Sequence, residues 1–326
     1  MAREMKRIMV TGALGQIGSE LTLALRKKFG QDNVLATDIK TPIGPELRDS
    51  GPFECVNVTN PETIKSAVKE YGIDTIFHMA AILSASGENR PQLAWQVNLN
   101  GTLHVLEAAR QHNLVRVFCP SSIAVFGPET PRLNTPNETV LKPKTMYGLT
   151  KVAGELLADY YVSRFQVDVR GCRYPGIISY ETPPSGGTTD YAVAIFFEAV
   201  KNKSFNCFLR ADTRLPMMYM PDCLKATLDL MEADFSKLRH HADFNVAAMS
   251  FSASELAAEI KRHIPDFKIT YEPDFRQAIA DSWPESIDDS AAREEWGWKP
   301  DYNLARMTAD MLNVLQKRLQ DGTLNY

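Results

Sequence analysis

The chain has 326 residues, 44% of them hydrophobic and 23% charged, so it is long enough to bury one large core or two modest ones. Its net charge of −4, with no run of Lys or Arg, argues against a nucleic-acid partner, and no apolar stretch is long enough to span a bilayer. Five scattered cysteines and six histidines form neither a disulfide framework nor a metal-ligand spacing, which indicates a reducing compartment and no bound metal.

The residues before the first predicted strand, Met1 to Lys6, are too few for a transit peptide and include no secretory apolar region. Because a mature or trimmed form would have lost such a peptide, the expected compartment is either the cytoplasm or the mitochondrial matrix. Both compartments keep thiols reduced.

The first predicted strand, Ile8 to Val10, runs into a glycine-rich turn and then into a helix that includes Ser19. The three glycines of the turn have separate physical reasons: one permits an unusual φ, one lets the backbone approach a pyrophosphate, and one lets the helix pack against the strand. Free N–H groups at the helix start then face phosphate oxygens. An ordinary strand-to-helix turn is the alternative reading. The residues expected to hold the pyrophosphate are Gly12, Gly15, Gln16, Ile17 and Gly18.

The second predicted strand runs from Val34 to Asp38 and ends in an acid. In a dinucleotide-binding fold, a carboxylate at this position accepts hydrogen bonds from the adenosine ribose and repels a 2′-phosphate, which favours NAD over NADP. Lys40 lies close enough to weaken this repulsion, and an acid that only ends a strand is the alternative reading.

A third short strand ends at Asn57 and Val58, which we place beside the cofactor, and a helix follows from Pro61 to Tyr71. The fourth strand, Asp74 to Ala81, runs into small residues that leave room for a cofactor across its end. Its His78 has apolar neighbours and no acid partner, which favours a packed strand residue over a base. The residues at its end that we expect to contact the cofactor are Met79, Ala80 and Ala81.

A helix is predicted over Trp95 to Leu106, with Asn98 as a polar interruption that a solvated helix face also explains. The next strand, Val115 to Cys119, leads into Ser121 and Ser122. Because ligands of parallel sheets bind beyond the carboxyl ends of the strands, the residues at those ends are expected to converge. They are Asp38, Asn57, Ala80 and Ser122.

Tyr147 and Lys151 lie four residues apart on a predicted helix after Pro143, so they share one helix face. A tyrosine has an ordinary pKa of about 10, and a nearby ammonium favours the phenolate. Such a tyrosine takes the proton of an alcohol while a nicotinamide cofactor accepts the hydride, and the Ser122 hydroxyl is placed to hold the alcohol oxygen. This spacing alone is common on helix surfaces; the preceding glycine turn and acid-ended strand make it informative.

Strands that alternate with helices predict an α/β fold, a Rossmann-type doubly wound parallel sheet, followed by a smaller C-terminal α/β lobe. We place the dinucleotide-binding domain at residues 1–172 plus about 212–248, and the substrate lobe at about 173–211 plus 249–326. Trp296 and Trp298 are expected in the small lobe. The helices predicted beyond Cys172 are 191–200, 221–232, 254–263 with Ser252 or Ser254 as its cap, and 304–319.

The sequence resembles the extended short-chain dehydrogenase/reductase superfamily over nearly its whole length. Its three turn glycines match the phosphate turn of that superfamily, Tyr147 and Lys151 match the catalytic pair, and Ser122 stands where the family has its catalytic Ser or Thr. The resemblance implies NAD as cofactor, Tyr147 as base, Lys151 on the nicotinamide ribose, and Asn98 as support for the lysine and a water. It also implies cofactor contacts at Tyr174 and Ile177.

Within the superfamily the chain is most similar to the short-chain type of L-threonine 3-dehydrogenase. Sugar-nucleotide epimerases usually carry Arg-Tyr-Phe-Asn at the position of Arg173 to Gly176 and have a longer, more basic C-terminal lobe, so both differences favour a small substrate. Asn57 departs from the acid that relatives place against adenine, which puts that contact in doubt. The stretches that carry the similarity are Ala80 to Ala85, Arg173 to Ser179, Gly186 to Ala192, Leu215 to Tyr219 and Gln277 to Pro284.

An amino-acid substrate needs donors for its carboxylate, an acceptor for its ammonium and an apolar wall for a methyl group. Asp190 is a conceivable ammonium partner, although it is equally suited to fixing a loop. The breaker cluster Pro183 to Gly187 is predicted to form a lid over the cleft, with a plain surface loop as the alternative. The residues expected around the substrate are Ser84, Ser121, Ser122, Tyr147, Gly176, Thr188, Thr189, Asp190 and Trp283.

The activity that the resemblance implies is NAD-dependent oxidation of the 3-hydroxyl of L-threonine to 2-amino-3-oxobutanoate, by a homodimer that pairs through helices beside the catalytic one. A sugar-nucleotide epimerase or dehydratase on the same scaffold is the first alternative. A dinucleotide-sensing protein without turnover is the second, and the presence of Ser122, Tyr147 and Lys151 argues against it.

Overall fold

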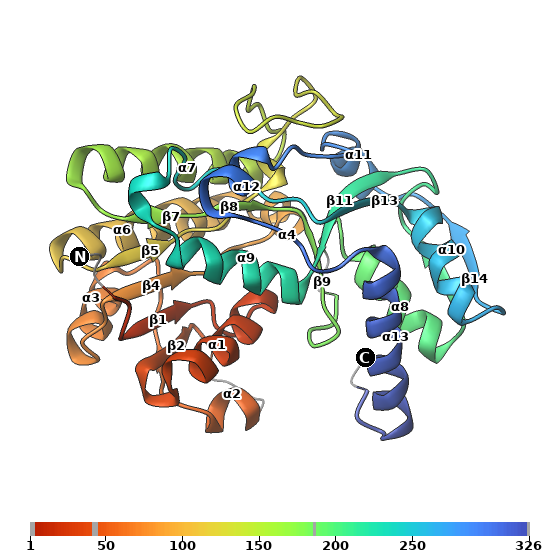
Figure 1. Cartoon of the computed structure of the whole chain (residues 1–326), viewed down its shortest axis with the longest axis horizontal. Helices are drawn as coiled ribbons and strands as arrows, with labels where there is room; N and C mark the ends of the chain where they lie inside the picture. The colour runs from red at the N-terminus through yellow and green to blue at the C-terminus, as the bar shows by residue number, and fades with distance from the viewer. Residues whose placement is uncertain (1–3, 41–44, 185–186, 325–326) are drawn as a thin grey trace.

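The alternating strands and helices of the N-terminal part build one six-stranded parallel sheet (Figure 1). The computed structural model describes residues 4–40, 45–184 and 187–324. The strand order in the sheet is β3 (Phe53–Cys55), β2 (Val34–Asp38), β1 (Ile8–Thr11), β4 (Thr75–His78), β5 (Arg116–Phe118) and β7 (Val169–Arg170).

Successive side chains of each strand point to opposite faces of this sheet, so both faces carry apolar residues, and helices cover both. Ile8 and Val10 face a core that they share with α1 and α9, whereas Met9 faces a second core shared with α3, α6 and α7. This arrangement is the predicted Rossmann-type, doubly wound fold. The helices of this half are α1 (Gln16–Phe29), α2 (Pro45–Asp49), α3 (Pro61–Glu70), α4 (Ser84–Asn89), α5 (Pro91–Ala94), α6 (Gly101–Gln111), α7 (Met146–Phe165) and α9 (Met220–Glu232), with short turns η1 (Gln31–Asn33), η3 (Ile123–Val125) and η4 (Phe235–Lys237).

Three small sheets follow the parallel sheet and connect it to the C-terminal lobe. One has the order β12 (Phe244–Asn245), β8 (Cys172–Tyr174) and β6 (Ser121–Ser122). The second has the order β13 (Met249–Ser252), β11 (Arg214–Tyr219) and β9 (Gly176–Ile178). The third pairs β10 (Ser204–Cys207) with β14 (Lys268–Tyr271).

The C-terminal lobe packs its helices around a separate core to the right in Figure 1. Phe196 from α8, Ile260 from α10 and Met311 from α13 meet the inner residues of β11 there. Ser252 caps α10 in a capping box with Glu255, which decides between the two predicted caps. The helices of this lobe are α8 (Tyr191–Lys201), α10 (Ala253–His263), α11 (Arg276–Asp281) and α13 (Leu304–Gln320).

The expectation that Trp296 and Trp298 belong to the small lobe is wrong. Trp296 ends α12 (Ser290–Trp296), Trp298 follows two residues later, and both pack in the core shared by the parallel sheet and α9. The ring of Trp296 lies 5.9 Å from that of Phe244, and the Trp298 indole donates to the carbonyl of Ala247 at 3.0 Å. The chain therefore returns to the first half of the molecule between α11 and α13.

Two other predicted boundaries also shift. The third strand ends at Cys55 rather than at Asn57 and Val58. The predicted helix over Trp95 to Leu106 contains a π-helical segment, η2 (Trp95–Asn100), before α6.

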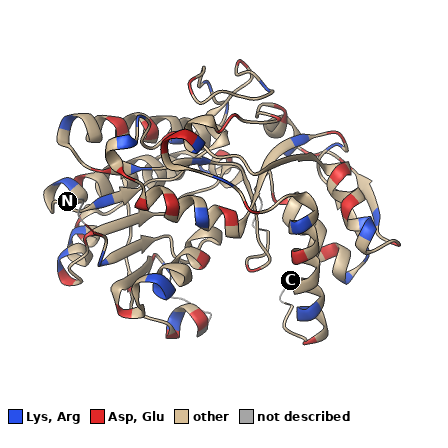
Figure 2. Ribbon diagram, viewed as in Figure 1, with Lys and Arg blue, Asp and Glu red and all other residues tan. Residues whose placement is uncertain are grey.

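Charged residues of both signs are interspersed over the two halves of the ribbon in Figure 2. This distribution agrees with the absence of a long basic run in the sequence. Within residues 4–40, 45–184 and 187–324, no helix combines the length and the apolar character needed to cross a bilayer.

Candidate active site

A cavity of about 330 Å³ lies where the glycine-rich turn, α7 and the start of the C-terminal lobe meet. The predicted site residues that line it are Gly15, Gln16, Ile17, Gly18, Met79, Ala81, Ser84, Ser121, Ser122, Tyr147, Lys151, Tyr174, Gly176, Ile177, Thr188, Thr189, Asp190 and Trp283. The predicted residues outside the lining are Gly12, Asp38, Asn57, Val58, Ala80 and Asn98. Gly187, at the end of the predicted lid, also lines the cavity, and the lining residues that sequence reasoning missed are Leu14, Leu83, Pro120, Ile123, Pro175 and Thr182. Most of these residues stand next to predicted site residues in the sequence, and that adjacency is the feature that could have indicated them.

The glycine-rich turn leaves no space for side chains. Gly12 has φ +65°, and a Cβ at this position would lie 2.6 Å from the backbone nitrogen of Ala80. A Cβ on Gly18 would collide with the carbonyl of Gly12. Gly15 precedes α1 without a side-chain cap, so the first N–H groups of the helix remain open toward the cavity, as a pyrophosphate requires.

Asp38 is held beside this turn at the end of β2. Its Oδ2 accepts a hydrogen bond from the Leu14 N–H at 3.1 Å, and its Oδ1 accepts one from the Ile39 N–H at 2.8 Å. A carboxylate has about four acceptor positions, so acceptor capacity remains for ribose hydroxyls. The glycine turn and Asp38 therefore fit the diphosphate and adenosine ribose of NAD.

Asn57 and Val58 lie away from the cavity in a turn that has its own hydrogen bonds. The Asn57 side-chain oxygen accepts from the N–H and the hydroxyl of Thr59 at 3.0 and 2.9 Å. Val58 is buried, and its carbonyl pairs with Nδ1 of His104 at 2.9 Å. Their cofactor contacts stay a prediction.

The side chains of Ser122, Tyr147 and Lys151 meet in the cavity. Tyr147 and Lys151 share one face of α7, which the N-cap Thr145 begins, and Nζ of Lys151 lies 5.6 Å from the Tyr147 ring centroid. The Lys151 ammonium donates to the carbonyl of Pro120 at 2.6 Å. This backbone contact fixes the lysine beside the residues that lead into β6.

Burial shifts the pKa of the two α7 residues toward their neutral forms. It raises the pKa of Tyr147 to about 12, partly offset by the Ser122 hydroxyl, and lowers the pKa of Lys151 to about 8. Lys151 is not among the groups that shift the pKa of Tyr147 in the ligand-free protein, where burial is the main cause, so its expected effect on that pKa stays a prediction. Oxidised nicotinamide carries a positive charge, which favours the phenolate when the cofactor is bound.

Asn98 does not lie on a solvated helix face but is buried behind α7. Its side-chain oxygen accepts from the Ile82 N–H at 2.7 Å, and its amide donates to the Ile82 carbonyl at 3.0 Å and to the Thr150 hydroxyl at 3.2 Å. It occupies the π-helical segment η2, a distortion often found at functional sites. Asn98 thus connects the end of the β4 segment to the catalytic helix, and its predicted cofactor role remains untested.

All of the predicted substrate residues line the same cavity. Thr188 lines the cavity and is buried, and its hydroxyl has no hydrogen-bond partner among the described residues. The Asp190 carboxylate accepts from the Gly187 N–H at 2.8 Å, which favours its alternative role in fixing the loop. Trp283 is buried and adds an apolar surface. Ser185 and Gly186 of the predicted lid lie outside the described residues.

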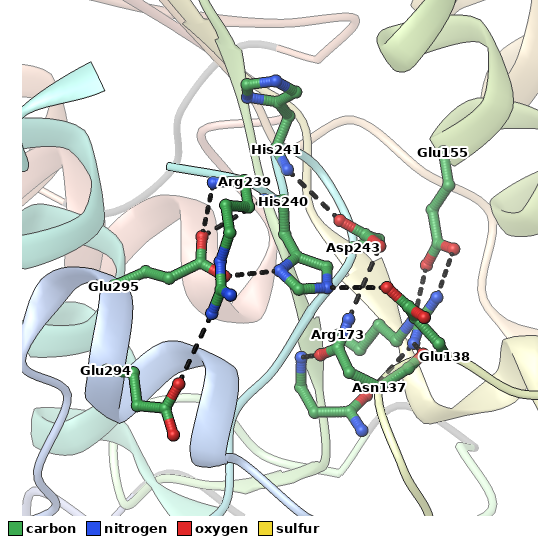
Figure 3. A network of polar contacts seen from close by, with 11 residues as sticks. Asn137, Glu138, Glu155, Arg173, Arg239, His240, His241, Asp243, Glu294 and Glu295 are labelled. Atoms are coloured by element: carbon green, nitrogen blue, oxygen red, sulfur yellow. Dashed lines mark hydrogen bonds and ion pairs between the residues drawn. The ribbon is translucent and has the colours of Figure 1, made fainter. Parts of the chain in front are cut away.

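A larger groove of about 1170 Å³ lies elsewhere, over the distal end of α7. None of the predicted site residues lines it. Figure 3 shows the polar network beside it, in which His240 bonds the carboxylate of Glu295 at 2.7 Å. The described part of the chain holds no group of three or more His, Cys, Asp or Glu side chains arranged for a metal ion.

A parallel sheet with a glycine turn, an acid-ended second strand and a Ser, Tyr and Lys set defines a Rossmann-type oxidoreductase that acts with a dinucleotide. The chain matches the NAD dependent epimerase/dehydratase family over residues 8–247. It belongs to that family, and NAD is its cofactor.

Proteins similar to this chain are described either as epimerases/dehydratases or as L-threonine dehydrogenases. An uncharacterized epimerase/dehydratase of Staphylococcus haemolyticus is 50% identical over 97% of this chain and 100% of its own length. The crystal structure of L-threonine dehydrogenase from Clostridium difficile is 50% identical, covers 99% of this chain and 100% of that one, and has a TM-score of 0.95. A monomeric L-threonine 3-dehydrogenase of metagenomic origin is 49% identical, with 95% and 99% coverage and a TM-score of 0.92.

Proposed function

We propose that this protein oxidises the 3-hydroxyl of L-threonine with NAD and forms 2-amino-3-oxobutanoate. The observation that carries the proposal is that one cavity brings Ser122, Tyr147 and Lys151 together with the glycine turn and with Thr188 and Trp283. The likeness to L-threonine dehydrogenases over nearly the whole chain supports the choice of substrate.

In the proposed reaction the Tyr147 oxygen removes the proton of the 3-hydroxyl, while the Ser122 hydroxyl holds that oxygen in place. NAD supplies the hydride acceptor. The Lys151 ammonium binds the nicotinamide ribose and supplies positive charge beside the phenol. Asp38 and the turn from Gly12 to Gly18 bind the adenosine ribose and the pyrophosphate.

The substrate carboxylate is proposed to take hydrogen bonds from hydroxyl groups, of which Thr188 Oγ1, unpaired within the described part of the chain, is the strongest candidate. Trp283 supplies the apolar wall for the methyl group. Discrimination against serine depends on that methyl contact, which is worth about 1–3 kcal/mol.

A homodimer is part of the proposal. Helices α6 and α7 lie side by side (Figure 1), and they expose Leu103, Leu149, Leu156 and Tyr160. Large apolar side chains gathered on neighbouring helices favour an interface between protein chains.

Epimerisation or dehydration of a sugar nucleotide is the second candidate, because the family and the curated relatives are described as epimerases/dehydratases. The two candidates differ in whether NADH leaves the enzyme. A dehydrogenase accumulates NADH with L-threonine, whereas an epimerase restores its cofactor in every turnover.

The test is an absorbance assay for NADH with purified protein, NAD and a panel of 3-hydroxy amino acids and UDP-hexoses. NADH formation with L-threonine, and none with UDP-hexoses, is the expected result. Conversion of a UDP-hexose without NADH release would assign the second candidate instead.

A further inference from the structure

Glu155 lies one turn beyond Lys151 on α7 and is buried, with 6% of its surface exposed. Its carboxylate forms a two-pronged ion pair with Arg173, in which Nε and one terminal nitrogen of the guanidinium each donate at 2.8 Å (Figure 3). The same carboxylate accepts a hydrogen bond from the Ser121 hydroxyl. A buried charge pair with this geometry fixes the three elements that supply its atoms.

Those elements carry the site. Ser121 on β6 pairs with Arg173 on β8, and the next pair in the same register is Ser122 with Tyr174. Glu155 therefore holds both members of one cross-strand pair, of which Ser121 lines the cavity, and both members of the adjacent pair line it too. Because Glu155 belongs to α7, the same contact sets the distance between β6 and the helix that carries Tyr147.

Arg173 is also anchored on its other side. It donates to the carbonyl of Asn137 at 2.6 Å and to the side-chain oxygen of Asn245 at 3.3 Å. Asn245 lies on β12, which pairs with β8. Acceptors on both sides thus hold the guanidinium in place, and its two bonds to Glu155 orient that carboxylate.

We propose that Glu155, with Arg173 as its counter-ion, is a positioning residue that aligns Ser122 with Tyr147 and places the negative end of the ion pair one helical turn from Lys151. The alignment part rests on the proposed function. Glu155 does not line the cavity, whereas Ser121 and Lys151 do, so we assign it a positioning role.

Several charged groups lie near the Glu155–Arg173 pair, and their effects on the pKa values of Lys151 and Asp159 can be stated one by one. Burial lowers the pKa of Lys151, while Cys119 and Glu155 oppose that shift. Asp159, one turn further along α7, has its pKa raised to about 6 by burial and by Asp243 and Glu155, with His240 and Arg173 opposing. Glu155 is the member of this group that lies both against Ser121 and one helical turn from Lys151.

The test compares the wild type with a paired variant, Glu155→Leu with Arg173→Met, which removes the ion pair without leaving a lone buried charge. The variant Glu155→Gln keeps the size of the side chain and removes its charge. If one of the two variants does not fold, the other still tests the proposal. Glu295→Gln is the matched control, because Glu295 is a buried carboxylate in the neighbouring network and contacts His240 rather than the site. Each protein is checked by thermal melting.

Two readouts are measured. The first is kcat and KM for L-threonine: we expect kcat to fall roughly 10- to 100-fold through misalignment, with KM changed less. The second is NADH affinity against pH, followed by NADH fluorescence, with Lys151→Met marking the profile without the ammonium. We expect the alkaline loss of affinity to shift by roughly one unit to lower pH in the folded Glu155 variants and to stay in place in Glu295→Gln.

An unshifted pH profile, or a wild-type kcat, in a folded Glu155 variant overturns the proposal and leaves the ion pair a purely structural feature. If the wild type does not oxidise L-threonine, the proposed function fails by itself. The shift in NADH binding then still decides whether Glu155 acts on Lys151.

Discussion

Tyr147 and Lys151 show how one cavity wall shifts two pKa values in opposite directions. Burial raises the pKa of Tyr147 to about 12 and lowers that of Lys151 to about 8, since both groups lose water around their charged forms. The tyrosine of the ligand-free protein is therefore a poor source of phenolate at neutral pH. Positive charge brought by the cofactor is what the proposed reaction needs at this position.

Replacement of Tyr147 by Phe removes the oxygen that takes the proton and keeps the ring. We expect kcat to fall by roughly 10²–10⁴-fold while NAD affinity stays nearly the same. Steady-state kinetics and NADH titration measure the two quantities. Tyr271→Phe, on β14 of the C-terminal lobe, serves as control, and equal turnover of Tyr147→Phe and wild type would rule out the tyrosine as base.

His78 provides a test of stability against pH. It is buried with Nδ1 paired to the Thr11 hydroxyl at 2.9 Å, and Nε2 has no partner within the described residues. Burial, with the charge of Lys151, lowers its pKa from 6.5 to about 3. The unfolded chain therefore binds this proton more readily, so the stabilising effect is present above pH 6.5 and is lost as the pH falls toward 3.

We expect this one group to lower the free energy of unfolding by about 2 kcal/mol between neutral pH and about pH 5. Urea unfolding of the wild type and of His78→Gln at both pH values measures it, and the variant should lack that part of the loss. His263→Gln, at an exposed position, is the control. Equal losses in wild type and His78→Gln would contradict the assignment.

The identities of the site residues were predictable at this scale because they depend on local order along the chain. Glycine turns, an acid at a strand end, and a tyrosine four residues before a lysine are visible in sequence. The role of Glu155 was not, because its partners Ser121 and Arg173 lie far from it in the chain and meet only through strand pairing. The sequence marks Asn98 as a poor helix former but does not reveal that its side chain is buried.

The turn between β1 and α1 is the element most sensitive to added volume. Gly18→Ala places a Cβ against the Gly12 carbonyl, so we expect NADH affinity to fall on the order of tenfold or more and the protein to lose about 1–3 kcal/mol of stability. NADH titration and thermal melting measure the two effects.

Gly154 offers the matched control on α7, where an added Cβ meets nothing within 4 Å. Gly154→Ala should leave NADH affinity unchanged and add up to about 1 kcal/mol of stability through helix propensity. If the two variants had the same NADH affinity, close packing at Gly18 would not be what the cofactor requires.

Element types followed from hydrophobic periodicity, and most predicted helices and strands occur where the pattern placed them. The differences arise where tertiary contacts override the local pattern. The π-helical turn at Trp95 to Asn100 forms where Asn98 is bonded to Ile82 and Thr150, both outside that helix. No propensity encodes that contact.

At the scale of the whole molecule, the α6–α7 surface predicts a homodimer. Leu156 is 66% exposed on α7, and Leu156→Glu should convert a dimer to monomers, because a charge at such an interface is costly. Light scattering coupled to gel filtration measures the mass. Phe275→Glu, at an equally exposed position of the C-terminal lobe, should leave it unchanged; a wild-type monomer would exclude the dimer.

Pattern alone determined the parallel α/β sheet, the dinucleotide turn and the Ser, Tyr and Lys set, because each depends on the spacing of residue types within or between adjacent elements. The tertiary structure decided how the lobes interleave: β11 joins a sheet with β9 and β13, and Trp296 and Trp298 pack back onto the first half. It also decided which polar side chains become buried pairs. Many surfaces of the elements are similarly hydrophobic. Which of them pack together depends on their shapes and on the elements they meet in the fold, and local sequence does not specify either.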